Sequence, residues 1–210
     1  MYCDAMMSTV SATHAPETPA APTVRDQIVD AADEYFSRYG YAKTTVADLA
    51  KAIGFSKAYI YKFFDSKQAI GEAICARCLA GQYEGIVAAV DAAKGPNERL
   101  RAFFKAIVDQ STEQLFNDRQ LYDIVVHSCS ERWESSEAFV AQLMAMLVRL
   151  VQEGRDAGAF ERKTPIDEVT RGIWFASLPF THPVMLQHNL DDVDSGLADV
   201  TSLILRSLAP

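Results

Sequence analysis

Apolar residues recur every three or four positions along most of the chain beyond residue 22, which is the spacing of one face of an α-helix. No segment alternates apolar and polar residues over the length of a strand. The pattern therefore predicts an all-α fold of about nine helices. Their expected ranges are 24–39, 44–53, 57–64, 67–93, 97–116, 118–133, 136–157, 165–178 and 192–208.

Signals for helix starts and stops support these ranges. Thr23 with Asp26, and Thr164-Pro165 with Asp167, have the spacing of N-terminal capping boxes. Further caps are expected at Thr44 or Thr45, Ser56 and Ser66. Helix ends are expected at Gly40, Gly54, Gly95-Pro96, Gly158 and Pro179.

Residues 44–67, TTVADLAKAIGFSKAYIYKFFDSK, contain two short helical segments joined by Gly54. Glycine permits the tight turn because positive φ costs it little. The positions expected to face inward are Leu49, Ala50, Ile53, Phe55, Ile60, Phe63 and Phe64, while Ala58, Tyr61 and Lys62 face outward with Tyr59 on the flank. This pattern predicts a helix-turn-helix, a motif that places its second helix in the DNA major groove.

The same stretch resembles the DNA-binding domain of the TetR/AcrR transcriptional regulators over about 45 residues from Val24 onward. The resemblance rests on Thr44-Thr45, Leu49-Ala50, Gly54-Phe55-Ser56, Ile60-Tyr61, Phe63-Phe64 and Ser66-Lys67. It departs from the family at Ala58 and Tyr59, where a glycine and a small hydroxyl residue are common, and at Phe63, where a histidine is common. The resemblance thus implies the mode of docking on DNA but not the bases that are read.

Candidate DNA contacts follow from residue chemistry. Hydroxyl and ammonium donors suit phosphate oxygens, and the second helix supplies side chains for base edges. The expected set is Thr44, Thr45, Ser56, Lys57, Ala58, Tyr59, Tyr61, Lys62 and Lys67. The alternative interpretation is that these are solvated residues of a small helical subdomain.

Charge is unevenly distributed along the chain. The whole sequence carries a formal charge of −8, yet residues 40–67 hold five lysines and two aspartates, a local charge of +3. A basic tip on an acidic body can dock on phosphates while the body limits non-specific binding. The Ala-, Pro-, Thr- and Ser-rich residues 1–22 are expected to form a disordered tail, followed by a DNA-binding domain at 23–67 and a second domain at 68–210.

The second domain is expected to hold a ligand pocket and a dimer interface. Its middle helices are rich in aromatic and sulfur-containing residues, which suit a mostly apolar pocket or an ordinary core. Proposed lining residues are Phe104, Tyr122, His127, Trp133, Met144 and Trp174, with Gln110 and Gln114 as further polar candidates. The resemblance implies that the last two helices pair with those of a second copy, through Ile173, Trp174, Leu178, Leu197, Val200, Ile204 and Leu208.

Other chemistry is weakly represented. Cys75 and Cys78 share one helical face, but a zinc site would need two more ligands, and no nearby sequence supplies them. We therefore interpret both as packed residues and expect no metal, no cofactor and no enzymatic activity. Neither an apolar run of membrane-spanning length nor a secretory signal is evident, and four irregularly spaced cysteines favour a reduced, cytoplasmic protein.

These observations lead to one hypothesis and one rival. The hypothesis is a homodimeric transcriptional regulator, most simply a repressor, that binds a palindromic double-stranded DNA operator and is released by a small apolar or amphipathic effector. The rival is a DNA-anchored interaction protein that recruits a protein partner without a small-molecule ligand.

Overall fold

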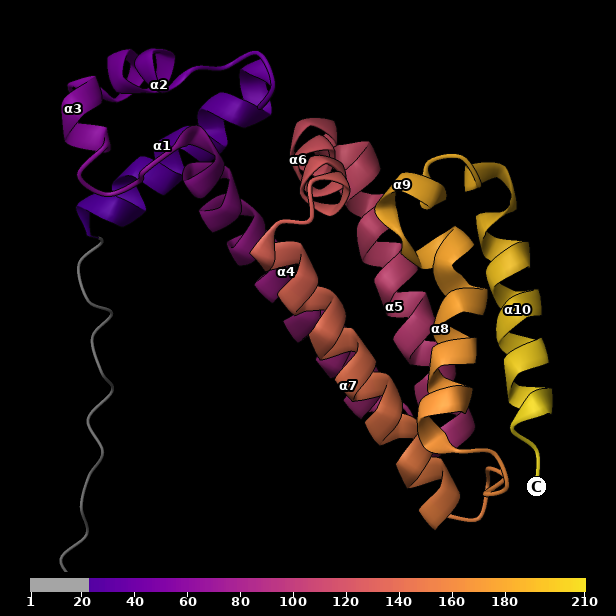
Figure 1. Cartoon of the computed structure of the whole chain (residues 1–210). Coiled ribbons are helices and arrows are strands. Elements are labelled where there is room, and N and C mark those ends of the chain that lie inside the picture. The colour runs from indigo at the N-terminus through magenta and orange to yellow at the C-terminus, as the bar shows by residue number, and fades with distance from the viewer. Residues whose placement is uncertain (1–22) are drawn as a thin grey trace, which may run out of the picture.

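A computed structural model describes residues 23–210, and the predicted tail at 1–22 lies outside the described residues. Within 23–210 the chain forms ten α-helices and one 3-10 helix, with no strand. The predicted all-α fold is therefore confirmed. Figure 1 shows a small N-terminal head of three helices joined through one long helix to an elongated body.

The head consists of α1 (Val24–Tyr39), α2 (Val46–Ile53) and α3 (Lys57–Ile60). Capping boxes start the first two helices, Thr23 with Asp26 and Thr45 with Asp48, and each satisfies backbone N–H groups that a helix start leaves free. Apolar residues from all three helices share one core. Its fully buried members are Ile28, Ala32, Phe36, Leu49 and Ile60.

The third helix is shorter than predicted. It ends at Ile60 rather than Phe64, because the next turns tighten: the N–H of Lys62 bonds to Tyr59 O, and that of Phe63 to Ile60 O. These are 3-10-type bonds, which often finish an α-helix. Ile60 and Phe64 are buried as expected, but Phe63 is exposed rather than packed inward.

α4 (Lys67–Ala92) belongs to both parts of the molecule. It begins at the predicted cap, Ser66, which accepts the N–H of Ala69. Its first half contributes Ile70 and Ile74 to the head's core, and its second half contributes Ile86 and Val90 to the core of the body. α4 alone among the described helices has the length and apolar composition of a membrane span, which its place in both cores explains.

The body contains α5 (Pro96–Asn117), α6 (Arg119–Ser130), α7 (Glu134–Asp156), α8 (Ile166–Thr181), α9 (Pro183–Leu186) and α10 (Val193–Ser207). A 3-10 turn at Leu190–Asp192 leads into α10. α4, α5 and α7 pack against one another, α8 packs on α5 and α7, and α10 covers α5 and α8 (Figure 1). α6 and α9 cap the end of the body nearest the head.

Two predictions around α8 are wrong. Pro165, not Thr164, is the N-cap, and no side chain caps this helix start. The backbone of Thr164 is instead hydrogen-bonded to the side chains of Arg155 and Glu161. Pro179 does not end α8 but lies inside it. Proline costs a helix one hydrogen bond. The helix continues to Thr181, and the residue after Pro179, Phe180, packs against α10. The Phe180 ring lies so close to Gly196 that it occupies the space a Cβ there would need.

Candidate DNA-binding surface and ligand cavity

The turn between α2 and α3 has helix-turn-helix geometry. Gly54 adopts the left-handed conformation, with φ 78° and ψ 20°, and its N–H bonds to Ala50 O. The N–H of Phe55 bonds to the same oxygen at 2.9 Å. Ser56 then caps α3 by accepting the N–H of Tyr59 at 3.1 Å, so Ser56 positions α3 through its side chain. The turn thus fixes α3 as a separate helix beside α2.

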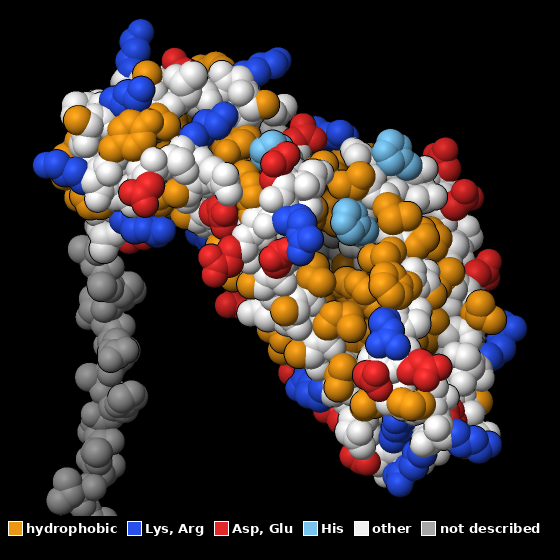
Figure 2. Space-filling view, in the orientation of Figure 1, with side chains coloured by type: hydrophobic (Ala, Val, Ile, Leu, Met, Phe, Trp, Pro, Cys, Tyr) orange, Lys and Arg blue, Asp and Glu red, His pale blue; other side chains and the backbone are white. Residues whose placement is uncertain are grey.

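The outer side of α3 and of the turn that follows it carries Lys57, Ala58, Tyr61 and Lys62, all exposed. Lys57 lies 5.7 Å above the ring of Tyr61 and Lys62 lies 5.6 Å above the ring of Tyr59, so each ammonium group is held beside an aromatic face. Figure 2 shows Lys and Arg side chains spaced around the head and acidic groups along the flank of the body. This segment has the donors and the exposure that DNA contact requires.

Tyr59 is half-buried in an aromatic row. Its ring lies 5.1 Å from that of Phe55 and 5.4 Å from that of Phe63, both edge to face. Such pairs favour a fixed ring orientation. Tyr59 therefore presents a rigid edge to the surface, and the exposed Phe63 belongs to the same row.

The hydroxyl groups of the two threonines before α2 both donate hydrogen bonds within the head. Thr44 is only 3% exposed and its hydroxyl donates to Gly40 O at 2.9 Å, which corrects the expectation that this hydroxyl reaches phosphate. Thr45 is exposed, but its hydroxyl donates to Asp48 at 2.7 Å. The same hydroxyl oxygen accepts the N–H of Asp48, so Thr45 acts first as a cap.

Lys67 also has a structural partner. Its Nζ donates to Tyr41 O at 3.0 Å and lies 4.3 Å from the centroid of the Tyr41 ring. Burial lowers the pKa of its ammonium group. This placement corrects the expectation that Lys67 is a free phosphate donor.

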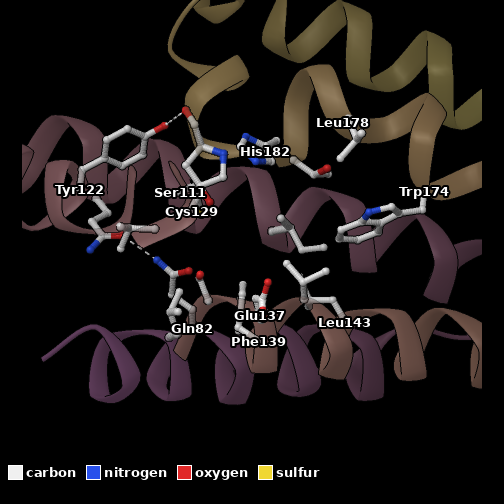
Figure 3. Close-up of a pocket in the computed structure, with 18 of the residues that line it drawn as sticks. Gln82, Ser111, Tyr122, Cys129, Glu137, Phe139, Leu143, Trp174, Leu178 and His182 are labelled. Atoms are coloured by element: carbon white, nitrogen blue, oxygen red, sulfur yellow. Dashed lines mark hydrogen bonds between the residues drawn. The ribbon is translucent and has the colours of Figure 1, made fainter. Parts of the chain in front are cut away.

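The body contains a cavity of about 410 Å³ between α4, α5, α6, α7 and α8, shown in Figure 3. Its volume falls within the range of small-molecule sites. The walls are mainly apolar, with polar groups from several helices. The lining residues are Leu79, Gln82, Ile107, Ser111, Gln114, Tyr122, Val125, Cys129, Arg132, Ser136, Glu137, Phe139, Val140, Leu143, Trp174, Leu178, Thr181, His182 and Pro183.

Of the residues proposed for the pocket, Tyr122, Trp174 and Gln114 line this cavity. Phe104 and Met144 lie in the core of the body instead, and the side chain of Gln110 donates to the backbone oxygens of Gln82 and Ala106. Trp133 is 2% exposed on the side facing the head, and His127 is exposed in the groove between head and α6. These five placements differ from the sequence-based set.

Sequence reasoning missed Gln82, Ser111, Thr181 and His182, all of which line the cavity. Each looks like an ordinary polar residue of an amphipathic helix. Leu178 also lines it, although the sequence assigned that residue to the dimer interface. Helical spacing gives the face on which a residue lies but not which neighbouring helix that face meets.

The polar lining is uncharged in its inner part. Tyr122 donates to Pro183 O at 2.6 Å, and burial raises the pKa of its phenol to about 12. Burial also raises the pKa of the Cys129 thiol to about 11 and lowers that of His182. The neutral form is thus favoured for all three side chains.

The cysteines show no sign of a metal site. Cys75, Cys78 and Cys129 are free thiols, and the described residues hold no cluster of three or more metal-ligating side chains. Cys75 is buried in the head's core, and Cys78 accepts a hydrogen bond from Gln114. Burial raises the pKa of Cys75, and that of Cys78 to about 11.

α6 lies between the cavity and the head. Tyr122, Val125 and Cys129 of α6 line the cavity, while the ring of His127, on the same helix, lies 5.3 Å from that of Tyr41 in the loop before α2, at a tilt of 47°. Trp133, just after α6, lies 5.5 Å from the Tyr41 ring. A displacement of α6 by a molecule in the cavity would therefore act directly on the head.

Most residues proposed for the dimer interface are buried within their own chain. Ile173, Leu197, Ile204 and Leu208 belong to the core of the body, which corrects their assignment, and Val200 packs against that core. The outward apolar side chains of α8 and α10 are instead Phe175, 62% exposed, and Leu203, 64% exposed. The helical period of the two helices is as predicted, and the predicted face is largely buried within the chain.

A head with this turn and this exposed α3 defines the class of helix-turn-helix DNA-binding proteins. Residues 28–74 match the family model of the bacterial regulatory proteins of the tetR family, and residues 96–200 match a tetracyclin repressor-like C-terminal domain. The chain belongs to the TetR family of transcriptional regulators.

Similar proteins support this assignment. The chain is 28% identical over 165 residues to the HTH-type transcriptional repressor KstR2 of Mycolicibacterium smegmatis, covering 76% of this chain and 78% of that one. Over 49 residues, 23% of this chain and 26% of the relative, it is 45% identical to the regulator IcaR of Staphylococcus aureus. The structure of FadR from Bacillus subtilis in complex with stearoyl-CoA has a TM-score of 0.60 at 18% identity, covering 87% and 96% of the two chains.

Proposed function

We propose that the protein is a homodimeric repressor that binds a palindromic operator and dissociates from it when a small apolar or amphipathic effector binds. The observation that carries this proposal is the position of α6, with the cavity on one side and the head's Tyr41 on the other. A DNA-binding head and a cavity in the body share this one helix. As a regulator bound to DNA, the protein would work in the cytoplasm.

The DNA contact is assigned to the outer side of α3. Lys57 and Lys62 contact phosphates, Tyr61 adds a hydroxyl, and Ala58 with the edge of Tyr59 faces the bases. Lys43 is exposed in the loop before α2 and joins this set as a phosphate contact. A single head reads few base pairs, so two heads on successive half-sites supply the specificity.

The dimer is assigned to the outward face of α8 and α10. Phe175 and Leu203 are large apolar side chains on two adjacent helices, and Gly172 and Ala176 extend the α8 side of that face. A Cβ added at Gly172 meets nothing within 4 Å, so a partner helix has room to approach closely. A second copy covering this face forms a four-helix contact.

Effector release works through a shift between two arrangements of the body. A molecule in the cavity displaces α6, and the Tyr41–His127 and Tyr41–Trp133 contacts transmit this displacement to the head. The two heads then no longer match successive major grooves. A 10- to 100-fold loss of DNA affinity requires only about 1.4 to 2.7 kcal/mol of coupling. An amphipathic effector is consistent with the structural neighbour FadR from Bacillus subtilis, which is described in complex with stearoyl-CoA.

The test is a selection of bound DNA from a randomised pool, followed by release of the selected site with hydrophobic compounds. We expect a palindromic motif, and release by compounds that also raise the protein's melting temperature. An asymmetric motif would contradict the dimer. A protein partner in pull-downs, together with no compound that stabilises the protein, would favour the rival function of a DNA-anchored interaction protein.

A further inference from the structure

Formal charges line the cavity only at its mouth. Among the described lining residues, Arg132 and Glu137 are the charged ones, and they pair with each other at 2.8 Å. Both side chains are mostly exposed, at 82% and 52%. The inner cavity therefore offers a ligand no unpaired cation and no unpaired anion.

The inner cavity does offer neutral hydrogen-bonding groups. The Nδ1 atom of His182 is buried without a partner. Ser111 is buried and lines the cavity, where its hydroxyl can pair with a ligand. Gln82 uses its Nε2 to donate to Gln114 at 2.7 Å, which leaves its own carbonyl oxygen to accept. Figure 3 shows these side chains around the space they line.

Buried polar groups are normally hydrogen-bonded, and leaving one unpaired costs free energy. A ligand that pairs with Ser111 or His182 removes that cost. A carboxylate or ammonium in the same place would lose its water without gaining a counter-charge, which costs several kcal/mol. The lining thus favours an uncharged polar group surrounded by apolar surface.

We infer that the effector is a neutral lipid-like molecule, whose buried part carries a hydroxyl, ester, thioester or amide oxygen and no formal charge. This inference rests on the proposed function, because it concerns the same cavity. A charged group can be attached only where it stays at the mouth, beside Arg132 and Glu137. A free fatty acid or a cationic amphiphile is therefore not expected to place its charged end in the inner cavity.

The experiment uses the full chain and matched probes. Straight alkyl chains of eight to sixteen carbons are each supplied as the alcohol, the methyl ester, the carboxylate and the primary amine, below their micelle concentrations. Binding is followed by the fluorescence of Trp174, with Trp174→Phe as the variant that removes the cavity reporter, and by the melting temperature. Affinities are normalised to each compound's water–octanol partition.

We expect the alcohols and esters to bind at least tenfold more tightly than the carboxylates and amines after this normalisation. Ser111→Ala should reduce alcohol and ester binding several-fold and leave the weak binding of the parent alkane unchanged. Val140→Ala, at an apolar lining position, serves as the control and should weaken all compounds alike. Equal or tighter binding of carboxylates or amines would overturn the inference.

DNA release is measured separately, so that the two proposals fail in different ways. Carboxylates that bind tightly and release DNA would overturn the neutral-ligand inference and leave the proposed function standing. Neutral compounds that bind but never release DNA would overturn the effector part of the proposed function and leave the ligand class standing. If no compound binds, both proposals are wrong.

Discussion

Lys67 and Tyr41 join the first turn of α4 to the loop that leads into α2. The Lys67 Nζ donates to the Tyr41 carbonyl at 3.0 Å and lies 4.3 Å from the centroid of the Tyr41 ring. The same ring lies 5.3 Å from His127 and 5.5 Å from Trp133. Lys67 thereby ties the loop before α2 to α4, beside the contacts of Tyr41 with His127 and Trp133.

Lys67→Met should weaken operator binding through the position of the head, not through a lost phosphate contact. The plot of log affinity against log salt should therefore keep its slope, while affinity falls several-fold. Fluorescence anisotropy with a labelled operator at four salt concentrations measures both quantities. A slope reduced by about 0.9 would instead mean that Lys67 neutralises a phosphate.

Lys57→Ala and Lys62→Ala should behave in the opposite way. Both ammonium groups are exposed on the outer side of α3. Each removed phosphate contact should flatten the salt slope by about 0.9 and weaken binding to all DNA sequences alike. Salt titrations with the operator and with an unrelated duplex test this expectation. If the slope is unchanged for both variants, α3 does not contact the backbone through these lysines.

The head could be predicted in some detail because its determinants are local. Thr23 and Thr45 each have an aspartate three residues later, and Gly54 stands where a left-handed residue is required. Such signals act within one turn of the chain and can be read directly from the sequence. The long helix from Lys67 was predictable for the same reason, since Ser66 caps it.

The cavity could not be predicted because it is formed by five helices whose pairing is not encoded locally. Phe104 and Tyr122 are both aromatic residues at helical spacing, yet one fills the core and the other lines the cavity. Pro179 shows the same limitation, because tertiary packing carries α8 past a residue that normally ends a helix. The apolar stripe of α10 was assigned to a dimer interface because helical spacing does not show that this stripe, including Leu197 and Ile204, is buried in its own chain.

Gly71→Ala should destabilise the protein at the contact between head and body. A Cβ at residue 71 would lie 2.9 Å from both Trp133 and Tyr41, within one aromatic cluster. Overpacking of this kind costs about 1 to 3 kcal/mol. Gly81→Ala in the same helix is the matched control, because its Cβ meets nothing, and it should stabilise by about 0.5 to 1 kcal/mol. Urea unfolding of both variants gives the comparison, and equal stability would contradict close packing at Gly71.

Phe175→Glu and Leu203→Glu should convert the dimer to a monomer and abolish tight operator binding. Each substitution places a charge on the outward face of α8 or α10. Contact with a second copy would bury that charge without a partner of opposite sign. Phe116→Glu, at an equally exposed position of α5, should leave the dimer intact. Light scattering after size-exclusion chromatography gives the mass. A dimer that survives both substitutions would place the interface elsewhere.

Cys78 and Cys129 should react slowly with iodoacetamide in the folded protein. Burial raises both thiol pKa values to about 11, and only the thiolate is nucleophilic. At pH 8 a thiol of pKa 11 is about 0.1% ionised and one of pKa 9 about 10%, so alkylation should be roughly 100-fold slower than in the unfolded chain. Mass spectrometry over time, in a Cys3→Ser background, assigns each rate. Rates that keep rising about tenfold per pH unit up to pH 10 would support the raised pKa values, whereas rates that level off above pH 9, the ordinary thiol pKa, would contradict them. A bound effector should protect Cys129, because that thiol lines the cavity.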